Sequence, residues 1–364
     1  MRIGIDARLA GLKHGGIGRY TEELLRYLTR EKTSHQWIVF LFEKGQLPWL
    51  ERASNVKIVY APIQHYTFAE QLKLPQIFNA EHLDLLHVPH FNIPLAYSKP
   101  YVVTIHDLLW HERREKNATT LSPGMYFLKY HAYKFISETA IRNARAVFVP
   151  TEHVKRIVLT HAKKQRVVVT PEGIAQAYVV KGSKAKRPYQ YLIYTGSLYP
   201  HKNVPYILDV LVGMQEFHLV IVSGRSVFQN AFIQEVNKRS LQDRVHVETM
   251  LEDNEIARLY RGAVAFITPS FSEGFGLPGL EALACGALVF ASDIPVFHEV
   301  YGDAATYINP NDSVTAIRAI TTVINHKELP VQLRMNAQRF VKNYSWQDMA
   351  HKTLQTYESL KVLL

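Results

Sequence analysis

The chain has 364 residues, of which 47% are hydrophobic, so it can fill the cores of two or three domains. No run of 18 apolar residues occurs, which excludes a membrane-spanning helix, and a strand pattern begins at residue 2, which argues against a signal peptide. The single Cys285 excludes an internal disulfide and is expected to serve packing rather than chemistry, and these features together predict a cytoplasmic protein.

Positive charge is concentrated in the first half of the chain. Residues 1–172 carry 24 Lys and Arg against 15 Asp and Glu, whereas residues 173–364 carry 18 against 17. A basic half predicts an anionic partner, either nucleic acid or an anionic membrane surface, although such charge also serves ordinary solubility. Because no nucleic-acid-binding motif is present, we expect no nucleic acid and favour peripheral contact with a membrane.

The first half alternates apolar runs with helix-like stretches, which predicts a doubly wound parallel α/β domain. Helices are expected after Gly18 and over residues 123–143. The second of these is rich in aromatic residues and Lys, so it lies in a membrane interface or packs against its own sheet. Strands are expected over residues 2–6, 37–42, 56–61, 85–90, 101–107, 146–151 and 166–170.

A glycine-rich run, Gly15-Gly-Ile-Gly-Arg-Tyr20, follows the first strand. Gly16 and Gly18 fit the first two glycines of a dinucleotide-binding fingerprint, but Thr21 stands where the third belongs, which disfavours an NAD site. A tight turn without a ligand and a loop that approaches a phosphate both remain open.

Two polar residues, His106 and Asp107, end the strand expected over residues 101–107. The carboxyl ends of parallel strands are where α/β proteins place their sites, so His106 is a candidate functional residue. Asp107 either orients His106 or caps the next turn. His87 and His90, at the end of the preceding strand, are weaker candidates for lining an acceptor site.

The second half repeats the same alternation after a hydrophilic stretch over residues 171–188, which is expected to be a linker or a loop. A last helix is expected from residue 346, with Ser345 as its cap and one apolar face to bury. Strands are expected over residues 191–195, 218–223, 244–248, 264–268, 288–292 and 306–309, and helices over 205–213, 231–238, 254–261, 278–285 and 314–324.

The second half opens with a strand, a loop and a helix start, Tyr194-Thr-Gly-Ser-Leu-Tyr-Pro-His-Lys-Asn-Val-Pro205. Helix N-termini present unpaired N–H groups that bind anions, so Lys202 beside this one is a candidate phosphate ligand. A solvent-facing loop lysine is the structural alternative.

A more specific pattern, Glu273-Gly-Phe-Gly-Leu-Pro-Gly-Leu-Glu281, follows the strand that ends at residue 268. Its glycines permit a tight loop that a ligand can approach, and its proline suits the start of a helix that Gly286 caps. Glu273 in the loop and Glu281 in the first turn suit hydroxyl pairs, because a carboxylate only accepts hydrogen bonds. Phosphate-binding amides beside two such carboxylates fit a nucleotide sugar.

The spacing of these glutamates resembles the donor-site signature of the retaining glycosyltransferases of family 4, and the glycine-rich run and the Lys202 loop resemble two further motifs of that family. The resemblance implies the GT-B fold, in which two Rossmann-like domains face each other across a cleft. Residues 1–172 would bind the acceptor, residues 173–345 the donor, and a helix over residues 346–364 would pack back on the first domain. The implied activity is retaining transfer of a hexose from a nucleoside diphosphate sugar to a glycan or lipid-linked acceptor in cell-surface polysaccharide or glycolipid synthesis.

The same resemblance assigns roles to single residues. Glu273 and His106 contact the reacting sugar, Glu281 the ribose and Lys202 the pyrophosphate. Leu251 lies in a loop similar to the one that holds the nucleobase. The other implied donor contacts are Gly16, Ser197, Gly274, Phe275, Gly276 and Leu277.

The chain departs from the family pattern at two positions. Ser197 stands where many members have Arg, and Arg225 is a candidate replacement. Many mannosyltransferases have Pro-Arg-Lys-Asn at this place, and here His201 replaces the Arg while the other three residues are present. GDP-mannose is therefore favoured as the donor only by those three residues. We expect no metal and no other cofactor, because no metal-ligand spacing is present.

Other classes remain open on these residues. One is a sugar-nucleotide epimerase of the same fold, and another is a non-catalytic nucleotide-sugar-binding protein. A glycoside hydrolase needs two carboxylates that flank the bond, but it does not need the phosphate-binding features. Sugar transfer to an added acceptor would separate these classes.

Overall fold

A computed structural model describes residues 1–11, 14–109, 123–224 and 227–361. The chain divides into two compact units. Unit 1 contains the described residues up to 172 together with 345–361, and unit 2 contains the described residues of 173–344.

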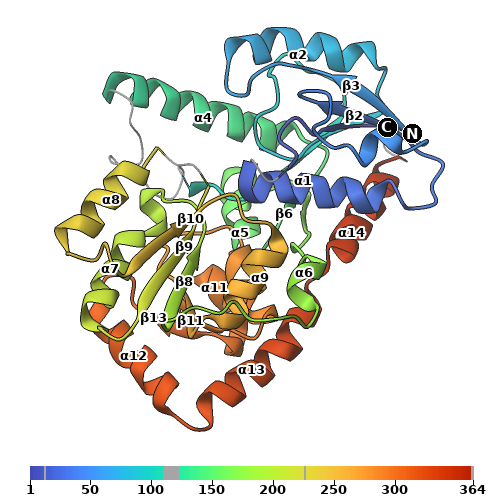
Figure 1. Cartoon of the computed structure of the whole chain (residues 1–364). Helices are drawn as coiled ribbons and strands as arrows, with labels where there is room; N and C mark the ends of the chain where they lie inside the picture. Colours follow the sequence, from blue (N-terminus) through green and yellow to red (C-terminus); the bar gives the residue numbers. More distant parts are fainter. Residues whose placement is uncertain (12–13, 110–122, 225–226, 362–364) are drawn as a thin grey trace. The chain divides into compact units, whose positions relative to one another are not determined.

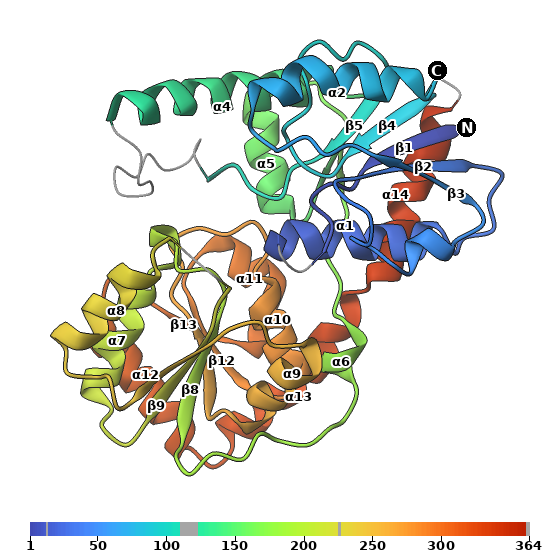
Figure 2. The same cartoon turned by 45° about the horizontal axis from the view of Figure 1, so that its top comes forward.

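Unit 1 is built on a seven-stranded parallel sheet with the strand order β3-β2-β1-β4-β5-β6-β7 (Figure 1). Helices α1 and α14 cover one face of this sheet, and α2, α4 and α5 cover the other (Figure 2). The strands are β1 Arg2–Asp6, β2 Gln36–Leu41, β3 Val56–Tyr60, β4 Leu85–Val88, β5 Tyr101–Thr104, β6 Val147–Val149 and β7 Val167–Val169. The helices are α1 Gly15–Leu28, α2 Phe68–Ala80, α4 Pro123–Asn143, α5 Glu152–His161 and α14 Trp346–Leu360.

Unit 2 is built on a six-stranded parallel sheet with the order β10-β9-β8-β11-β12-β13. Helices α7, α8 and α12 lie on one face, and α9, α10, α11 and α13 lie on the other. The strands are β8 Tyr191–Thr195, β9 His218–Val222, β10 Val245–Glu248, β11 Ala265–Thr268, β12 Leu288–Ser292 and β13 Thr306–Ile308. The helices are α6 Gln176–Val179, α7 Val204–Gly213, α8 Gln229–Lys238, α9 Asp253–Gly262, α10 Leu277–Ala284, α11 Pro295–Tyr301, α12 Ser313–Asn325 and α13 Leu329–Phe340.

Both sheets reverse their strand order beside their first strand. The reversal lies between β1 and β4 in unit 1 and between β8 and β11 in unit 2. The loops that follow such a pair of strands leave toward opposite faces of the sheet, so a crevice opens at the carboxyl ends of the strands. Each unit therefore has one place where its topology favours a ligand site.

Every strand expected from the sequence is present, because strands covered on both faces read as continuous apolar runs. The strand expected over residues 101–107 ends at Thr104, so His106 lies in the loop beyond β5. Four longer helices that were not expected are α2, α5, α11 and α13. In α2, Pro75 lies inside the helix, where proline normally argues against one.

The expected linker over residues 171–188 is bound to unit 2. Arg261 of α9 donates hydrogen bonds to the carbonyl oxygens of Ala177 and Val180. The Ala185 N–H donates to the carbonyl of Arg258 at 2.8 Å. The stretch is therefore an exposed loop around the short helix α6 (Gln176–Val179), as its hydrophilic composition predicts, and these hydrogen bonds tie its backbone to unit 2.

Helix α14 follows unit 2 in the sequence but packs against α1 of unit 1. The Ser345 side chain caps it by accepting from the Asp348 N–H at 3.2 Å, as predicted. On its buried face, the Tyr357 hydroxyl lies 2.5 Å from His87 Nδ1. The apolar face expected for this helix is thus buried within unit 1.

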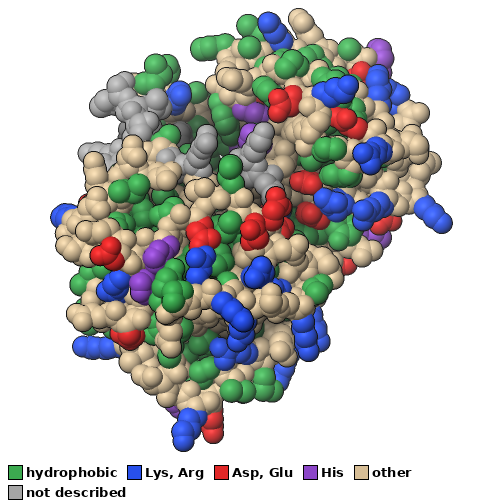
Figure 3. Space-filling model, viewed as in Figure 1, with side chains coloured by type: hydrophobic (Ala, Val, Ile, Leu, Met, Phe, Trp, Pro, Cys, Tyr) green, Lys and Arg blue, Asp and Glu red, His purple; other side chains and the backbone are tan. Residues whose placement is uncertain are grey.

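Charged side chains of both signs are interspersed over the face of the molecule in Figure 3. Among the described residues on that face, Lys and Arg do not gather into one basic block, despite the positive balance of the first half. On this face the described residues therefore form no basic groove. None of the helices in the described ranges is long and apolar enough to cross a bilayer.

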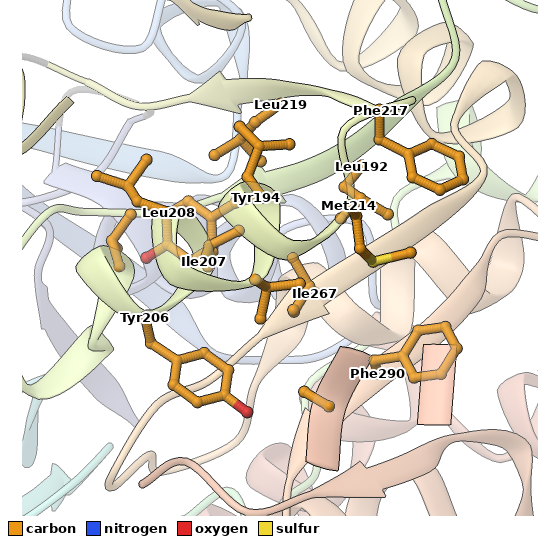
Figure 4. Close-up of a cluster of buried hydrophobic side chains, with 14 of the residues drawn as sticks. Leu192, Tyr194, Tyr206, Ile207, Leu208, Met214, Phe217, Leu219, Ile267 and Phe290 are labelled. Carbon is orange, nitrogen blue, oxygen red and sulfur yellow. The ribbon is translucent and has the colours of Figure 1, made fainter. Parts of the chain in front are cut away.

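The core of unit 2 lies between its sheet and α7 (Figure 4). Leu192 and Tyr194 of β8 and Ile267 of β11 face Ile207 and Leu208 of α7. Full burial of one such aliphatic side chain contributes about 1.5–3 kcal/mol to stability. This packing fixes the carboxyl ends of β8 and β11, from which the loops after these two strands leave.

Candidate functional site

A pocket in unit 2 lies at the carboxyl ends of β8 and β11, where the strand order reverses. The free space for the centre of a water-sized group is about 30 Å³. The loop after β8, the short 3-10 turn η3 (Pro200–Lys202) and the loop from β11 into α10 line it. The structure thus brings together Lys202 and Glu273, which the sequence predicts on separate motifs.

A buried tyrosine makes glycine necessary at two positions of this pocket. Gly276 has φ 92°, and a Cβ there would lie 2.4 Å from Tyr301 Oη. A Cβ at Gly279 would lie 2.3 Å from the same oxygen, which donates a hydrogen bond to the Gly276 carbonyl. Tyr301 thus occupies the space of a side chain at both positions, and the two glycines line the pocket with their backbone at the start of α10.

Lys202 and Glu273 form an ion pair inside the pocket. Lys202 Nζ lies 2.7 Å and 2.6 Å from the two carboxylate oxygens, and Ser270 Oγ donates to one of them at 2.7 Å. Burial would raise the pKa of Glu273, but the charge of Lys202 and its hydrogen bonds hold the pKa below the usual value. Glu273 is therefore ionised at neutral pH. An ammonium group has three N–H donors, so the pair leaves Lys202 one donor for an anion.

His201 precedes Lys202 in the same turn. Burial and the neighbouring charge of Lys202 lower the pKa of His201 to about 4, so its imidazole is neutral at pH 7. Lys202 is therefore the positive charge that this turn contributes to the pocket.

Three predicted donor contacts differ from the expectation in detail. Glu281 lies in the second turn of α10 and not in the first, because the helix begins at Leu277, and it is 4% exposed. Phe275 and Leu277 are buried, and the Phe275 ring packs edge-on against Tyr344 at 5.6 Å. These two residues can therefore meet a ligand only through their backbone.

The remaining donor contacts predicted in unit 2, Ser197, Leu251 and Gly274, are not among the residues that line this pocket. Gly274 belongs to the loop that enters α10, and the carbonyl of Ser197 accepts from the Tyr194 hydroxyl at 2.6 Å. Leu251 lies half-buried in the loop between β10 and α9. Arg225, the candidate replacement for an arginine at position 197, lies outside the described residues. Contacts of these residues with a ligand stay predictions.

In unit 1, His106 is held by two acceptors. Its Nε2 lies 3.2 Å from the carbonyl oxygen of Pro89, and its Nδ1 lies 3.3 Å from Glu172 Oε1. The Tyr20 ring packs edge-on against it at 4.7 Å. Because both ring nitrogens lie against these acceptors, His106 must give up one of the two contacts to reach a sugar hydroxyl. For Asp107, the structure shows the cap alternative, since its carboxylate accepts from the Leu109 N–H.

The glycine-rich run forms the first turn of α1. A Cβ at Gly18 would lie 2.0 Å from the carbonyl oxygen of Gly11, so glycine is needed there for close packing. At Gly16 a Cβ would meet no atom of the described residues within 4 Å. Gly16 therefore leaves its backbone approachable, as a ligand contact requires, although that contact stays a prediction.

His87 does not line an acceptor site, contrary to the prediction. It is fully buried, with its ring nitrogens against the hydroxyls of Tyr357 and Thr104. Burial, with a smaller effect from His106, lowers the pKa of His87 to about 3, so it is a neutral structural residue.

Sequence reasoning missed two residues of these sites. Glu172 follows the carboxyl end of β7, and the rule that singled out His106 applies equally to it. Tyr301 shapes the loop at Gly276 from 25 residues away, and no local pattern announces such a contact.

Cys285 is expected to react slowly with iodoacetamide at pH 7.5. Burial raises the pKa of its thiol to about 12, and the thiolate is the reactive form. Intact-mass measurement should show that alkylation of the folded protein is slower than that of the urea-unfolded protein by at least about tenfold. Equal rates would contradict the packing role.

Two family models match the chain in succession. "Glycosyltransferase Family 4" matches residues 14–177, and "Glycosyl transferases group 1" matches residues 180–340. The first match covers most of unit 1, and the second covers the pocket with Lys202 and Glu273 and also includes Glu281 of α10.

Curated relatives and solved structures agree with these matches. The chain is 27% identical over 292 residues to the O-antigen chain mannosyltransferase RfbU of Salmonella typhimurium, covering 79% of this chain and 77% of the relative. It is 25% identical over 372 residues to O-antigen chain mannosyltransferase B of Escherichia coli, covering 95% and 96%. Its fold is similar to that of a sucrose-phosphate synthase from Thermosynechococcus elongatus, with a TM-score of 0.80 and 16% identity over the whole of both chains.

Proposed function

We propose a specific reaction for this chain, which belongs to the group 1 and family 4 glycosyltransferases, has the GT-B fold and is a hexosyltransferase. In the proposed reaction it moves mannose from GDP-mannose to an acceptor hydroxyl with retention of configuration. The acceptor is a glycan or a lipid-linked glycan of a cell-surface polysaccharide. Support for this substrate class comes from the two relatives, whose names describe mannose transfer to O-antigen chains.

The observation that carries the proposal is the pocket of unit 2. It combines a lysine, an ionised glutamate and a glycine-lined helix start at one topological switch point. A diphosphate matches the cation and the open backbone, and a sugar hydroxyl matches the carboxylate. A hydrolase would not need the diphosphate-binding part of this combination, and the two matched family models favour a transferase over an epimerase of the same fold.

The proposed chemistry breaks the bond between the sugar C1 and the donor phosphate oxygen, and the electron pair leaves with the diphosphate. The acceptor oxygen forms the new bond on the same face, and its proton passes to the departing phosphate oxygen. Lys202 and the amides at the start of α10 stabilise the negative charge that develops on the leaving group. Glu273 orients the sugar and at the same time holds Lys202 in place.

Peripheral contact with an anionic membrane is part of the proposal, and α4 supports it. Met125, Phe127, Leu128 and Phe135 are about half or more exposed, and Lys129 is exposed among them. The alternative, that this helix packs against its own sheet, holds only for the last turns of α4, where buried residues face the core of unit 1. Sedimentation with vesicles that contain phosphatidylglycerol should pull down the protein, and a variant with Phe127 and Leu128 changed to Ser should stay in solution.

The transferase activity is tested by thermal unfolding and then by turnover. A nucleoside diphosphate at 100 times its dissociation constant stabilises a protein by about 2.7 kcal/mol. We expect a shift with GDP and smaller shifts with UDP, ADP, dTDP and NAD. GDP release from GDP-mannose should then increase when a mannose-terminated glycan is added and should persist in EDTA. A shift with NAD alone would contradict the proposal.

Glu281→Gln is expected to weaken GDP-mannose binding at least tenfold while the fold survives. The change keeps the shape of this nearly buried residue but removes its charge, and a hydrogen bond to a charged group contributes about 1.5–3 kcal/mol. Titration calorimetry measures the affinity, and Glu216→Gln on the exposed surface of the same unit is the control. Unchanged affinity would remove Glu281 from the ribose site.

A further inference from the structure

Unit 1 has a recess at its own topological switch point, where no function has been assigned so far. It lies at the carboxyl ends of β1 and β4, and Asp6, His65, His90 and Asn92 contribute its polar lining. The first turns of α1, which contain the glycine-rich run, close one side. The free space for the centre of a water-sized group is about 10 Å³. That is the room that one water molecule or one hydroxyl group needs.

A buried charge network holds the polar lining in place. The Arg8 guanidinium, 1% exposed, donates to both oxygens of Asp6 and to Glu70 Oε1 at 2.7–2.8 Å. Glu70 in turn accepts from the side-chain amide of Asn92 and contacts His65 at 3.3 Å. Burial would raise the pKa values of both carboxyl groups, but Arg8, and for Glu70 also the hydrogen bond from His65, hold them below their usual values.

Two nitrogen atoms of the lining have no hydrogen-bond partner within the described part of the chain. They are His65 Nε2 and His90 Nδ1, and both are buried. Burial lowers the pKa of His90 to about 3, so its imidazole is neutral and offers one donor and one acceptor. A buried polar atom without a partner is costly, and a ligand hydroxyl at this place would satisfy one.

An aromatic side chain stands beside the recess in a strained conformation. Tyr66 has φ 62°, which is unusual for a bulky residue, and its N–H donates to Glu70 Oε2 at 2.7 Å. Its hydroxyl lies 3.4 Å from His90 Nε2, and its ring is 62% exposed. The charge network thus holds an exposed aromatic face next to a polar recess, and such a face packs against the C–H groups of a sugar ring.

The charges of the network restrict the ligand. Two ionised carboxylates, Asp6 and Glu70, belong to this network, and the Asp6 carboxylate lines the recess. A phosphate or carboxylate group would be repelled at this place, whereas a hydroxyl both donates to Asp6 and accepts from an imidazole N–H.

We propose that the recess is an acceptor subsite, which takes one hydroxyl of an uncharged hexose at the end of the acceptor while Tyr66 supports the sugar ring. This inference rests on the proposed transfer of a sugar to a hydroxyl acceptor. It adds the class of acceptor, a neutral sugar rather than a phosphorylated one, and the residues that select it.

Ligand-observed saturation-transfer NMR on the full chain with GDP present tests the proposal. The probes are methyl α-mannopyranoside, methyl α-glucopyranoside, methyl α-galactopyranoside and mannose 6-phosphate. We expect binding of at least one methyl glycoside, and weaker binding of the phosphorylated sugar by about tenfold or more. No binding of any neutral glycoside, or a preference for mannose 6-phosphate, would overturn the proposal.

Matched variants place the binding in the recess. Val88 lines it, and its partner in the sheet register, Val103 of β5, belongs to the same core but does not line it. Val88→Ile adds one methylene to the recess and should weaken the glycoside by about tenfold, whereas Val103→Ile adds the same group and should leave binding unchanged. If both variants bind the glycoside as the wild type does, the recess is not the subsite.

A second variant covers the case in which Val88→Ile does not fold. Tyr66→Gly suits the backbone at φ 62° and removes the ring, so the fold should persist while glycoside binding falls. Tyr60→Ala is the control for the loss of an exposed aromatic ring away from the recess. Alanine rather than glycine is used there because Tyr60 belongs to β3, which glycine would disturb. The GDP-induced thermal shift is also measured on every sample. A missing shift counts against the proposed transferase function, whereas the glycoside result alone decides whether the recess binds a sugar.

Discussion

Lys202→Ala is expected to lower the turnover of hexose transfer by about 100- to 1,000-fold, the size of effect seen when one preorganised donor to developing charge is removed. In unit 2, Lys202 is the cation of the pocket at the carboxyl end of β8, and the neutral His201 beside it cannot replace the charge. Steady-state kinetics with GDP-mannose measure the effect. Lys238→Ala, an exposed lysine at the end of α8, should leave turnover unchanged.

The same change should also destabilise unit 2, because it leaves Glu273 buried without its partner. Breaking a buried ion pair costs about 3–5 kcal/mol, and the partial exposure of Lys202, at 21%, places this pair at the lower end. A double variant, Lys202→Met with Glu273→Gln, should regain most of that stability but none of the activity. Normal turnover in Lys202→Ala would assign the phosphate to another residue.

Arg8→Met is expected to be the most destabilising single change in unit 1, by about 3–5 kcal/mol at pH 7. The guanidinium is fully buried and pairs with two carboxylates, at 2.7 Å to Asp6 and 2.8 Å to Glu70. Methionine fills the space but leaves both negative charges without a partner. Urea unfolding measures the loss, and Arg142→Met, at an exposed pair on α4, is the control with an effect below about 1 kcal/mol.

The dependence of this effect on pH distinguishes charge from packing. In the wild type, both carboxyl pKa values lie below their usual values, so their contribution is present above pH 5 and is lost as the pH falls through the lowered values. Without Arg8, burial raises the same pKa values, and the folded variant takes up protons more readily than the unfolded chain. The stability of Arg8→Met should therefore rise, relative to the wild type, between pH 7 and pH 4. A difference that does not change with pH would show that Arg8 acts through packing alone.

The fold was predictable because its strands are buried on both faces. Runs such as residues 191–195 and 218–222 contain almost only apolar residues, so no tertiary information is needed to recognise them. Helix α2 was not predictable in this way. It contains Pro75, and Phe68 and Leu72 on it are exposed, so its apolar residues do not mark one buried face.

Only those features of the site that lie within one short sequence motif were predictable. The sequence placed Lys202 and Glu273 beside two helix starts, but it did not show that these residues, 71 positions apart, bind each other. For the same reason His87 was misjudged, because its partner Tyr357 is contributed by a helix 270 residues away. Contacts between distant segments follow from the packing of the sheets, and no local pattern of one sequence records them.

The path of the chain through the two units determines the order in which they can be completed during synthesis. The described residues of unit 2 all lie between residues 173 and 344, whereas unit 1 also needs α14, which follows unit 2 in the chain. Until α14 is made, the His87 side chain lacks the Tyr357 hydroxyl, and the face of α1 that α14 covers stays exposed. The nascent chain therefore holds an unfinished unit 1 while unit 2 can already fold, and a truncated variant that ends before residue 345 would leave that face uncovered.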